Sequence, residues 1–441
     1  MKINFAVAIA LAGSFLVAGC SDSDGVAPKG PTANVRVLHA SPDAPAVDVA
    51  IDGDVVLTSV EFQQGTGYLE VPAGAREVSI LVGGSEVLSE TFDVQDGESY
   101  SIIAQDVVAN LDLVALNDTD RRANGTADVT VVHASPSAGD VDIYITAAGD
   151  PLPGTTPLDD VPFGTNATLG NQPAGDYQVR ITPAAGTDVV YDSGTLPISS
   201  DVTAVAVNSV KGVSPVSLLI WAEANPAVTA VLDNTAEVRV VHGVEDVAVD
   251  VFVDGDAVAS NFMYTNVSGY LVVPAGDRDV AVAPAGQGVG NALASLSDTL
   301  TVERGESYTV IAAGDSNNLS DTQLIVLGDR RSASDDTQAD VRLVHAAAAP
   351  GAQPVDIFVL PAGQAPVVGD DTFGDVVIGQ DTGYTSLPPA SYDVTISPDG
   401  TTTPAISVPG LSLAAGDVKT AIAIGASDGT LDALLLDDLR P

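Results

Sequence analysis

The feature of this sequence that most constrains its fold is a five-residue segment that occurs four times. Each copy has the pattern Val-x-Val/Leu-x-His, and the copies are Val35–His39, Val129–His133, Val238–His242 and Val341–His345. These hold the only four histidines of the chain, at intervals of 94, 109 and 103 residues. Units of this length suit sandwich domains better than the short repeats of a small solenoid. The sequence therefore predicts four domains in tandem.

The repeats alternate between two types. All four carry Val-Asp-Val/Ile after the histidine, with its aspartate at Asp48, Asp142, Asp250 and Asp356. The first and third share an Asp-Gly-Asp turn, a Gly-Tyr strand ending in Val-Pro-Ala-Gly, and Gly-Glu-Ser-Tyr, whereas the second and fourth lack the turn. This A-B-A-B order indicates duplication of a two-domain unit. The predicted domains are A1 (34–119), B1 (127–234), A2 (236–329) and B2 (339–441).

Local patterning favours an all-β chain. Short Val-rich runs alternate with clusters of Gly, Pro, Asp and Ser about every 8 to 12 residues, and no segment has a helical apolar stripe. The helix formers are scarce, with 11 Glu and 4 Lys against 48 Asp. We expect four tandem antiparallel β-sandwich domains of the immunoglobulin-like kind.

The N-terminus has the pattern of an export signal. A positive charge at Lys2 precedes an apolar run over 3–17, which is too short for a stable membrane span. The sequence Leu-Val-Ala-Gly-Cys ending at Cys20 resembles the bacterial lipobox, whose cysteine is acylated after cleavage. We therefore expect a signal peptide over 1–19, lipidation at Cys20, and a flexible tether over 20–33. The resemblance, with Ser21 after the cysteine, implies membrane anchoring, with the outer membrane favoured.

The repeats also resemble a known family. His39 begins the sequence His-Ala-Ser-Pro-Asp-Ala-Pro-Ala-Val-Asp-Val, and a Gly-Tyr strand with Val-Pro-Ala-Gly follows. This resembles the bacterial domain-of-unknown-function 4397 family, found in tandem in exported proteins. The second repeat matches in part, while Gly243 and Ala346–Ala349 depart from Ala-Ser-Pro. The resemblance implies fold and export but no catalytic residue.

The recurring histidine and aspartate invite an acid–base or metal interpretation. Strand alternation places Val35, Val37 and His39 on one face and Arg36 on the other. In the next strand Asp48 points away from the apolar face. We therefore expect the histidines to be structural, bonding the backbone of the loop that follows. The same parity predicts ion pairs between the outer-face arginines and aspartates, namely Arg36–Asp48, Arg239–Asp250 and Arg342–Asp356.

Metal sites receive limited support from the sequence. Zinc needs several converging His, Cys or carboxylate ligands, and each repeat supplies a single histidine. Calcium takes oxygen ligands, so Asp52, Asp54, Asp254 and Asp256 are candidates, together with the acidic pairs Asp335-Asp336 and Asp370-Asp371. An Asp-Gly pair between strands is first of all a hairpin turn, and no EF-hand spacing occurs. We expect no obligatory cofactor, with Ca²⁺ as the open alternative.

Other functional signals are few. Ser427 lies in a Gly-x-Ser-x-Gly sequence, but no histidine follows it, as the nucleophile elbow requires. No phosphate-binding loop or dinucleotide fingerprint occurs. The double arginines at 121–122 and 330–331 could hold an anion or bind carboxylates of a neighbouring domain. The net charge of −43 argues against nucleic-acid binding and favours a soluble surface.

These observations favour a non-enzymatic, lipid-anchored envelope protein with a structural or ligand-binding role. Its partners would be the membrane, through the lipid, and a protein or glycan. The first alternative is a calcium-dependent carbohydrate- or matrix-binding protein, which an open cluster of Tyr68, Tyr270 and Tyr384 would favour. The second is a hydrolase that uses a repeated histidine such as His39 or His345.

Overall fold

The computed structural model describes residues 30–118, 126–154, 158–184, 186–222, 227–348, 354–425 and 431–440. Its secondary structure is almost entirely β, which confirms the predicted class. The exceptions in these ranges are four single-turn 3₁₀ helices: η1 (Val108–Asn110), η2 (Val289–Asn291), η3 (Ala294–Leu296) and η4 (Leu319–Asp321). Among the described residues no helix is both long and apolar enough to cross a bilayer.

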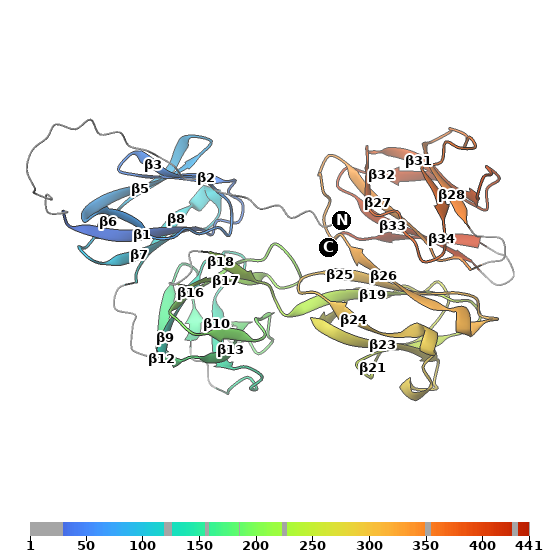
Figure 1. Ribbon diagram of the computed structural model, residues 1–441, viewed down its shortest axis with the longest axis horizontal. Coiled ribbons are helices and arrows are strands. Elements are labelled where there is room, and N and C mark those ends of the chain that lie inside the picture. Colours follow the sequence, from blue (N-terminus) through green and yellow to red (C-terminus); the bar gives the residue numbers. More distant parts are fainter. Residues whose placement is uncertain are drawn as a thin grey trace, which may run out of the picture.

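The strands fall into eight sheets, two in each repeat (Figure 1). The strands of A1 are β1 (Thr32–His39), β2 (Val47–Ile51), β3 (Asp54–Val60), β4 (Leu69–Pro72), β5 (Gly74–Val82), β6 (Ser85–Val94), β7 (Ser99–Gln105) and β8 (Asp112–Asn117). Those of B1 are β9 (Thr126–His133), β10 (Val141–Ala147), β11 (Leu158–Val161), β12 (Asn166–Pro173), β13 (Gly175–Pro183), β14 (Tyr191–Asp192), β15 (Leu196–Ile198), β16 (Val202–Asn208), β17 (Val216–Ala222) and β18 (Val228–Val231).

The second half of the chain repeats this plan. The strands of A2 are β19 (Thr235–Gly243), β20 (Val249–Val253), β21 (Asp256–Phe262), β22 (Leu271–Pro274), β23 (Gly276–Pro284), β24 (Ser297–Val302), β25 (Ser307–Ala313) and β26 (Gln323–Asp329). Those of B2 are β27 (Ala339–His345), β28 (Val355–Pro361), β29 (Phe373–Val376), β30 (Thr385–Leu387), β31 (Ala390–Pro398), β32 (Ile406–Leu413), β33 (Val418–Gly425) and β34 (Leu431–Asp437).

The two sheets of a repeat have fixed strand orders. In A1 they are β4-β1-β7-β8 and β3-β2-β5-β6, and the other repeats keep this arrangement with small additions in B1. Pairing is antiparallel except at one place in each repeat, where the strand that carries the histidine runs parallel to a later strand. These parallel pairs are β1–β7, β9–β16, β19–β25 and β27–β33. We call the sheet that contains each parallel pair the histidine sheet.

Each sandwich core uses the face predicted from the alternation. Val35 and Val37 of β1 pack with Val47 and Val49 of β2, and all four are at most 2% exposed. Since β1 and β2 belong to different sheets, their inward faces close a single core. The equivalent Val and Ile positions form the cores of the other repeats.

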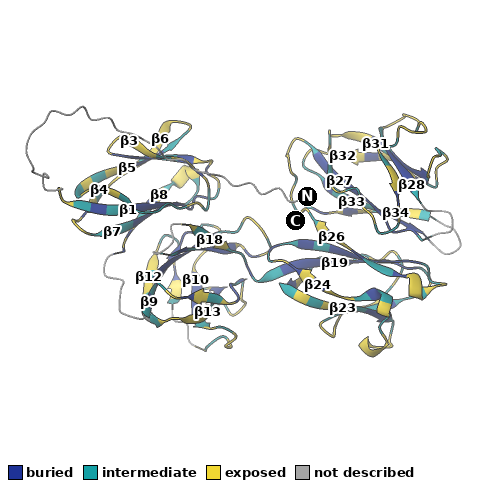
Figure 2. Ribbon diagram, viewed as in Figure 1, coloured by how far each residue is buried: buried dark blue, intermediate teal, exposed yellow. Residues whose placement is uncertain are grey.

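The outer face of each histidine sheet is buried as well. Figure 2 accordingly colours most residues of β1 and β19 as buried. Leu38 and Ile103 of A1 form one cluster with Val132, Val205 and Leu219 of B1, and all five are fully buried. An equivalent cluster joins A2 to B2. The repeats therefore pack in pairs, histidine sheet against histidine sheet, which Figure 1 shows as blue over green and orange over yellow. We call A1 with B1 the first module and A2 with B2 the second module.

The two modules also contact each other. Nη1 of Arg304 in A2 donates to the carbonyl oxygens of Ser193 and Leu232 in B1, at 2.5 and 3.3 Å. Lys211 of B1 forms an ion pair with Glu306 of A2. The B1–A2 boundary is therefore a contact surface built from both repeats.

Candidate functional site

The repeated histidines bond the backbone, as the sequence predicts. Nε2 of His39 lies 3.3 Å from the carbonyl oxygen of Pro45, and the amide of Ser41 donates to its Nδ1. His133 contacts the carbonyl of Gly139 at 2.6 Å, and His242 that of Val247 at 2.7 Å. Because Nδ1 of His39 accepts an amide proton, its own proton must sit on Nε2 and face the carbonyl. The imidazole thus ties the end of the strand to the loop that follows.

Burial lowers the pKa of His39, His133 and His242, although the carbonyl beside each ring opposes this shift. The folded chain therefore holds the rings neutral, whereas the unfolded chain protonates them below about pH 6.5. Between that pH and the lowered folded pKa the unfolded state binds more protons. These histidines are therefore expected to leave the free energy of unfolding unchanged above about pH 6.5 and to lower it as the pH drops below that value.

Calorimetric melts between about pH 7.5 and 5 check this dependence. Replacing His242 with Asn should remove part of the slope. A melting temperature that stays constant or rises on acidification would contradict the buried, neutral state of these rings.

The repeated aspartates support a bulge in the neighbouring strand. Asp48 accepts a hydrogen bond from the amide of Ser59 at 2.8 Å, and Asp250 accepts one from Asn261 at 2.8 Å. The same contact joins Asp142 to Asp160 at 2.8 Å and Asp356 to Asp375 at 3.3 Å. The donors have φ between 50° and 55°, and each lies at an irregularity in the pairing. Each carboxylate thus satisfies an amide of a bulge with a left-handed residue.

The predicted ion pairs between outer-face arginines and these aspartates are wrong. Arg36 lies in β1 and Asp48 in β2, and these strands belong to opposite sheets of the sandwich. The same separation holds for Arg239–Asp250 and Arg342–Asp356. The prediction assumed that consecutive strands pair, whereas the neighbours of β1 are β4 and β7.

The calcium candidates lie at hairpin turns. Asp52 and Gly53 have φ of 52° and 85°, as a two-residue type I′ turn requires. The two oxygens of Asp52 accept hydrogen bonds from Arg76 and from the amide of Glu77. Asp254 repeats this arrangement with Arg278 and the amide of Asp279. Asp54 and Asp256 are exposed at the starts of β3 and β21. No set of three or more His, Cys, Asp or Glu suited to a metal occurs among the described residues.

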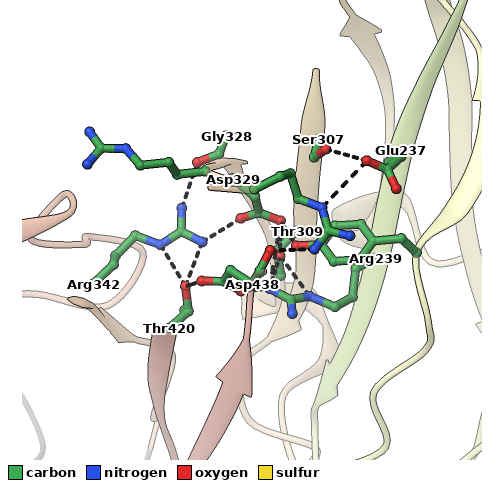
Figure 3. Close-up of polar contacts among 12 residues, drawn as sticks. Glu237, Arg239, Ser307, Thr309, Gly328, Asp329, Arg342, Thr420 and Asp438 are labelled. Atoms are coloured by element: carbon green, nitrogen blue, oxygen red, sulfur yellow. Dashed lines mark hydrogen bonds and ion pairs between the residues drawn. The ribbon is translucent and has the colours of Figure 1, made fainter. Parts of the chain in front are cut away.

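The most elaborate polar site lies in the second module, where two buried arginines cross between the repeats (Figure 3). Arg239 of A2 donates to Thr309 in its own repeat and reaches Asp438 of B2 at 2.5 Å. Arg342 of B2 donates to Thr420 in its own repeat and reaches Asp329 of A2 at 2.5 Å. The arginine side chains are 4% and 2% exposed, and both carboxylates are fully buried.

Each aspartate is further held within its own repeat. Tyr270 and Thr309 donate to Asp329, at 2.7 and 2.5 Å. Tyr384 and Thr420 donate to Asp438, at 2.8 and 2.6 Å. Burial raises the pKa of both tyrosines, so the phenols stay protonated and donate. The result is a two-fold symmetric network of charges that are paired and hydrogen-bonded, which is the condition for burying them. We call it the crossed arginine network.

The first module has half of this network. Arg36 donates to Ser101 at 2.7 Å and lies 3.7 Å from Asp118, to which Tyr68 also donates. B1 has Thr130 at the position that arginine occupies in the other repeats, so β9 lacks the counterpart of Arg342. The Arg36 guanidinium lies 3.9 Å from the ring centre of the fully buried Trp221 of B1.

The three tyrosines do not form an open aromatic platform. Tyr68 lies under Arg36 in the first module, and Tyr270 and Tyr384 lie in the second. Their hydroxyl groups donate to the buried aspartates described above. This placement counts against their use as a carbohydrate-stacking surface.

The double arginine of the second module binds carboxylates, one of the two predicted uses. Arg330 lies 2.9 Å from Asp340, and Arg331 lies 3.5 Å from Glu237 and 3.8 Å from the ring centre of Tyr270. The signal peptide, Cys20, the arginines at 121–122 and Ser427 lie outside the described residues.

The crossed arginine network and the pairing of repeats were not predicted from the sequence. A signal for the pairing was present, because Leu38, Val132, Val241 and Val344 make the histidine strand apolar on its outer face too. Strands buried on both faces have this continuous apolar pattern. No pattern in the sequence indicated which carboxylates form ion pairs with the arginines.

Two solved structures resemble this chain distantly. The Bacillus anthracis TIE protein is 9% identical, with 89% of this chain and 67% of that chain covered, at a TM-score of 0.17. A structure titled "Alpha-glucan binding by a streptococcal virulence factor" is 11% identical, with 38% and 91% covered, at a TM-score of 0.16. Neither likeness carries an argument at these scores. No curated protein matches the chain.

A family profile, in contrast, matches most of the chain. The profile described as "Domain of unknown function (DUF4397)" matches residues 33–144, 236–358 and 347–441. These segments include the histidine strands of A1, B1, A2 and B2, and together they span most of the sequence. The chain therefore belongs to the DUF4397 family.

Proposed function

We propose that this chain is a non-enzymatic, lipid-anchored protein of the bacterial envelope with a structural or ligand-binding role. The single observation that carries the proposal is that the repeated residues bond to the backbone of their own domains. The four aspartates and the histidines described above hold the backbone within the sandwiches. What recurs in every repeat thus serves the framework, as expected of a scaffold.

The packing supports a scaffold in a second way. Each module buries apolar clusters and paired charges between its two repeats. Apolar contact and hydrogen-bonded charge pairs both favour one relative placement of the two domains. An acidic exterior on such modules favours solubility outside the cell and resistance to aggregation.

Metabolic labelling with an alkyne fatty acid in a bacterial host tests the anchoring. The chain should take up label and sediment with membranes, since two or more acyl chains anchor stably. The Cys20→Ser variant should lose both properties. An unlabelled chain found in the periplasm or medium would overturn the lipid-anchored function.

The alternative of calcium-dependent binding is less favoured by the geometry. Both oxygens of Asp52 and of Asp254 already accept hydrogen bonds from an arginine and an amide. A calorimetric melt with millimolar calcium, compared with sodium at equal ionic strength, distinguishes calcium-dependent binding from the proposed function. A specific upward shift would favour the calcium-dependent alternative, because a ligand that binds only the folded state stabilises it.

A further inference from the structure

A cleft of about 580 Å³ opens where B1, A2 and B2 meet. B1 contributes Lys211, A2 contributes Glu306, and the A2–B2 linker contributes Arg330 and Arg331. Arg440, at the end of B2, lines the same cleft. Its volume is in the range typical of small-molecule sites, which often lie between domains.

Positive charge gathers at this cleft in an otherwise acidic chain. Four of its lining residues are cationic, Lys211, Arg330, Arg331 and Arg440, against 16 basic and 59 acidic residues in the whole sequence. Lys211, Arg330 and Arg440 keep 47%, 41% and 33% of their side-chain area exposed. Their charged ends are therefore within reach of a ligand.

Most carboxylates around these cations are buried. Asp340, the partner of Arg330, is 1% exposed, and Glu237, the partner of Arg440, is 6% exposed. Asp329 also lines the cleft, but its side chain is fully buried. Glu306, the partner of Lys211, is 32% exposed, so it is the one acidic group of the lining that a ligand meets directly.

The polar residues of the lining further restrict the class of ligand that fits the cleft. The exposed hydroxyl-bearing Ser332 and the half-exposed Glu306 lie among the cations, and both can bond to hydroxyl groups. The planar guanidinium of Arg440 is well suited to bind a carboxylate. One of its two terminal nitrogens, Nη2, already donates to Glu237 at 2.6 Å. A doubly charged phosphate or sulfate would meet more repulsion from Glu306 than a single carboxylate does. A ligand that carries one carboxylate and several hydroxyl groups satisfies both sets of partners.

We propose that this cleft binds an acidic saccharide of the uronic-acid type, with the sugar carboxylate at Lys211 and Arg440 and its hydroxyl groups toward Ser332 and Glu306. The proposal rests on the ligand-binding part of the proposed function and does not depend on lipid anchoring. Because the lining comes from three repeats, binding also links the first module to the second.

Isothermal titration of the purified full chain with galacturonic acid, which carries one carboxylate, tests the site. Galactose serves as the neutral sugar, and sodium sulfate at matched ionic strength serves as the simple anion. The double variant Lys211→Gln/Arg440→Gln removes the two charges, and Lys211→Gln alone is the milder change. Arg76→Gln is the matched control, since Arg76 is a partly exposed, ion-paired arginine on A1.

Galacturonate should bind, and the double variant should weaken binding by about tenfold or more. The single variant should have a smaller effect, and the Arg76 control none. Absence of binding, equal binding of galactose or sulfate, or unchanged affinity in the double variant would each overturn the proposal. Fatty-acid labelling at Cys20 would be unaffected by that failure, so the two proposals fail separately.

Discussion

Replacing Arg342 with alanine is expected to destabilise the second module by about 3–5 kcal/mol. The substitution leaves the fully buried Asp329 without its closest cation, which lies 2.5 Å away in the native chain. Arg239 lies 3.7 Å from Asp329, but it is already paired with Asp438 at 2.5 Å. It therefore cannot move to Asp329 without leaving Asp438 unpaired. An uncompensated buried carboxylate is costly, whatever the intact pair contributes.

Differential scanning calorimetry measures this effect. The transition of the second module should move to lower temperature, while that of the first module stays in place. Arg278→Ala is the matched control, because Arg278 is ion-paired to Asp254 at an exposed hairpin. Its loss should cost at most about 1 kcal/mol. Similar shifts for the two variants would contradict the buried position of the crossed arginine network.

Replacing Trp221 with alanine should have a comparable effect on the first module. Trp221 is fully buried, and its Nε1 donates to the carbonyl of Thr66 in A1 at 3.3 Å. Removing the ring leaves a cavity between the repeats and removes the aromatic face that Arg36 contacts, at a cost of about 3–5 kcal/mol. Calorimetry should show the first module melting at lower temperature and the second unchanged.

The control for this variant is Val210→Ala, since Val210 is 65% exposed on the same repeat. That change should alter stability by less than about 0.5 kcal/mol. If Trp221→Ala melts like the native chain, the contact between A1 and B1 does not contribute to stability as the structure indicates.

Much of the fold followed from local pattern. The strand alternation predicted which side chains enter each core, and Val35, Val37 and Val49 lie there. The Asp-Gly pair predicted the hairpin at Asp52, since few other residues adopt positive φ at both central positions. The backbone role of His39 followed from its place at the inner end of a strand.

What sequence did not yield is the pairing of distant strands and of whole domains. The ion pair expected between Arg36 and Asp48 assumed that neighbours in sequence are neighbours in a sheet, whereas β1 pairs with β4 and β7. The partner of Arg342 is Asp329, in the preceding repeat. Such contacts depend on how two finished sandwiches meet, and no local period encodes that geometry.

Fluorescence of Trp221, the only tryptophan of the chain, tests the face-to-face pairing of repeats most directly. The ring lies on the outer face of the histidine sheet of B1, where A1 covers it and Arg36 stacks on it at 3.9 Å. Pairing predicts blue-shifted emission, weak quenching by acrylamide, and a red shift when Arg36 is replaced by alanine. Emission and quenching like those of free tryptophan in the native chain would show that A1 and B1 do not pack, and would contradict the modular architecture.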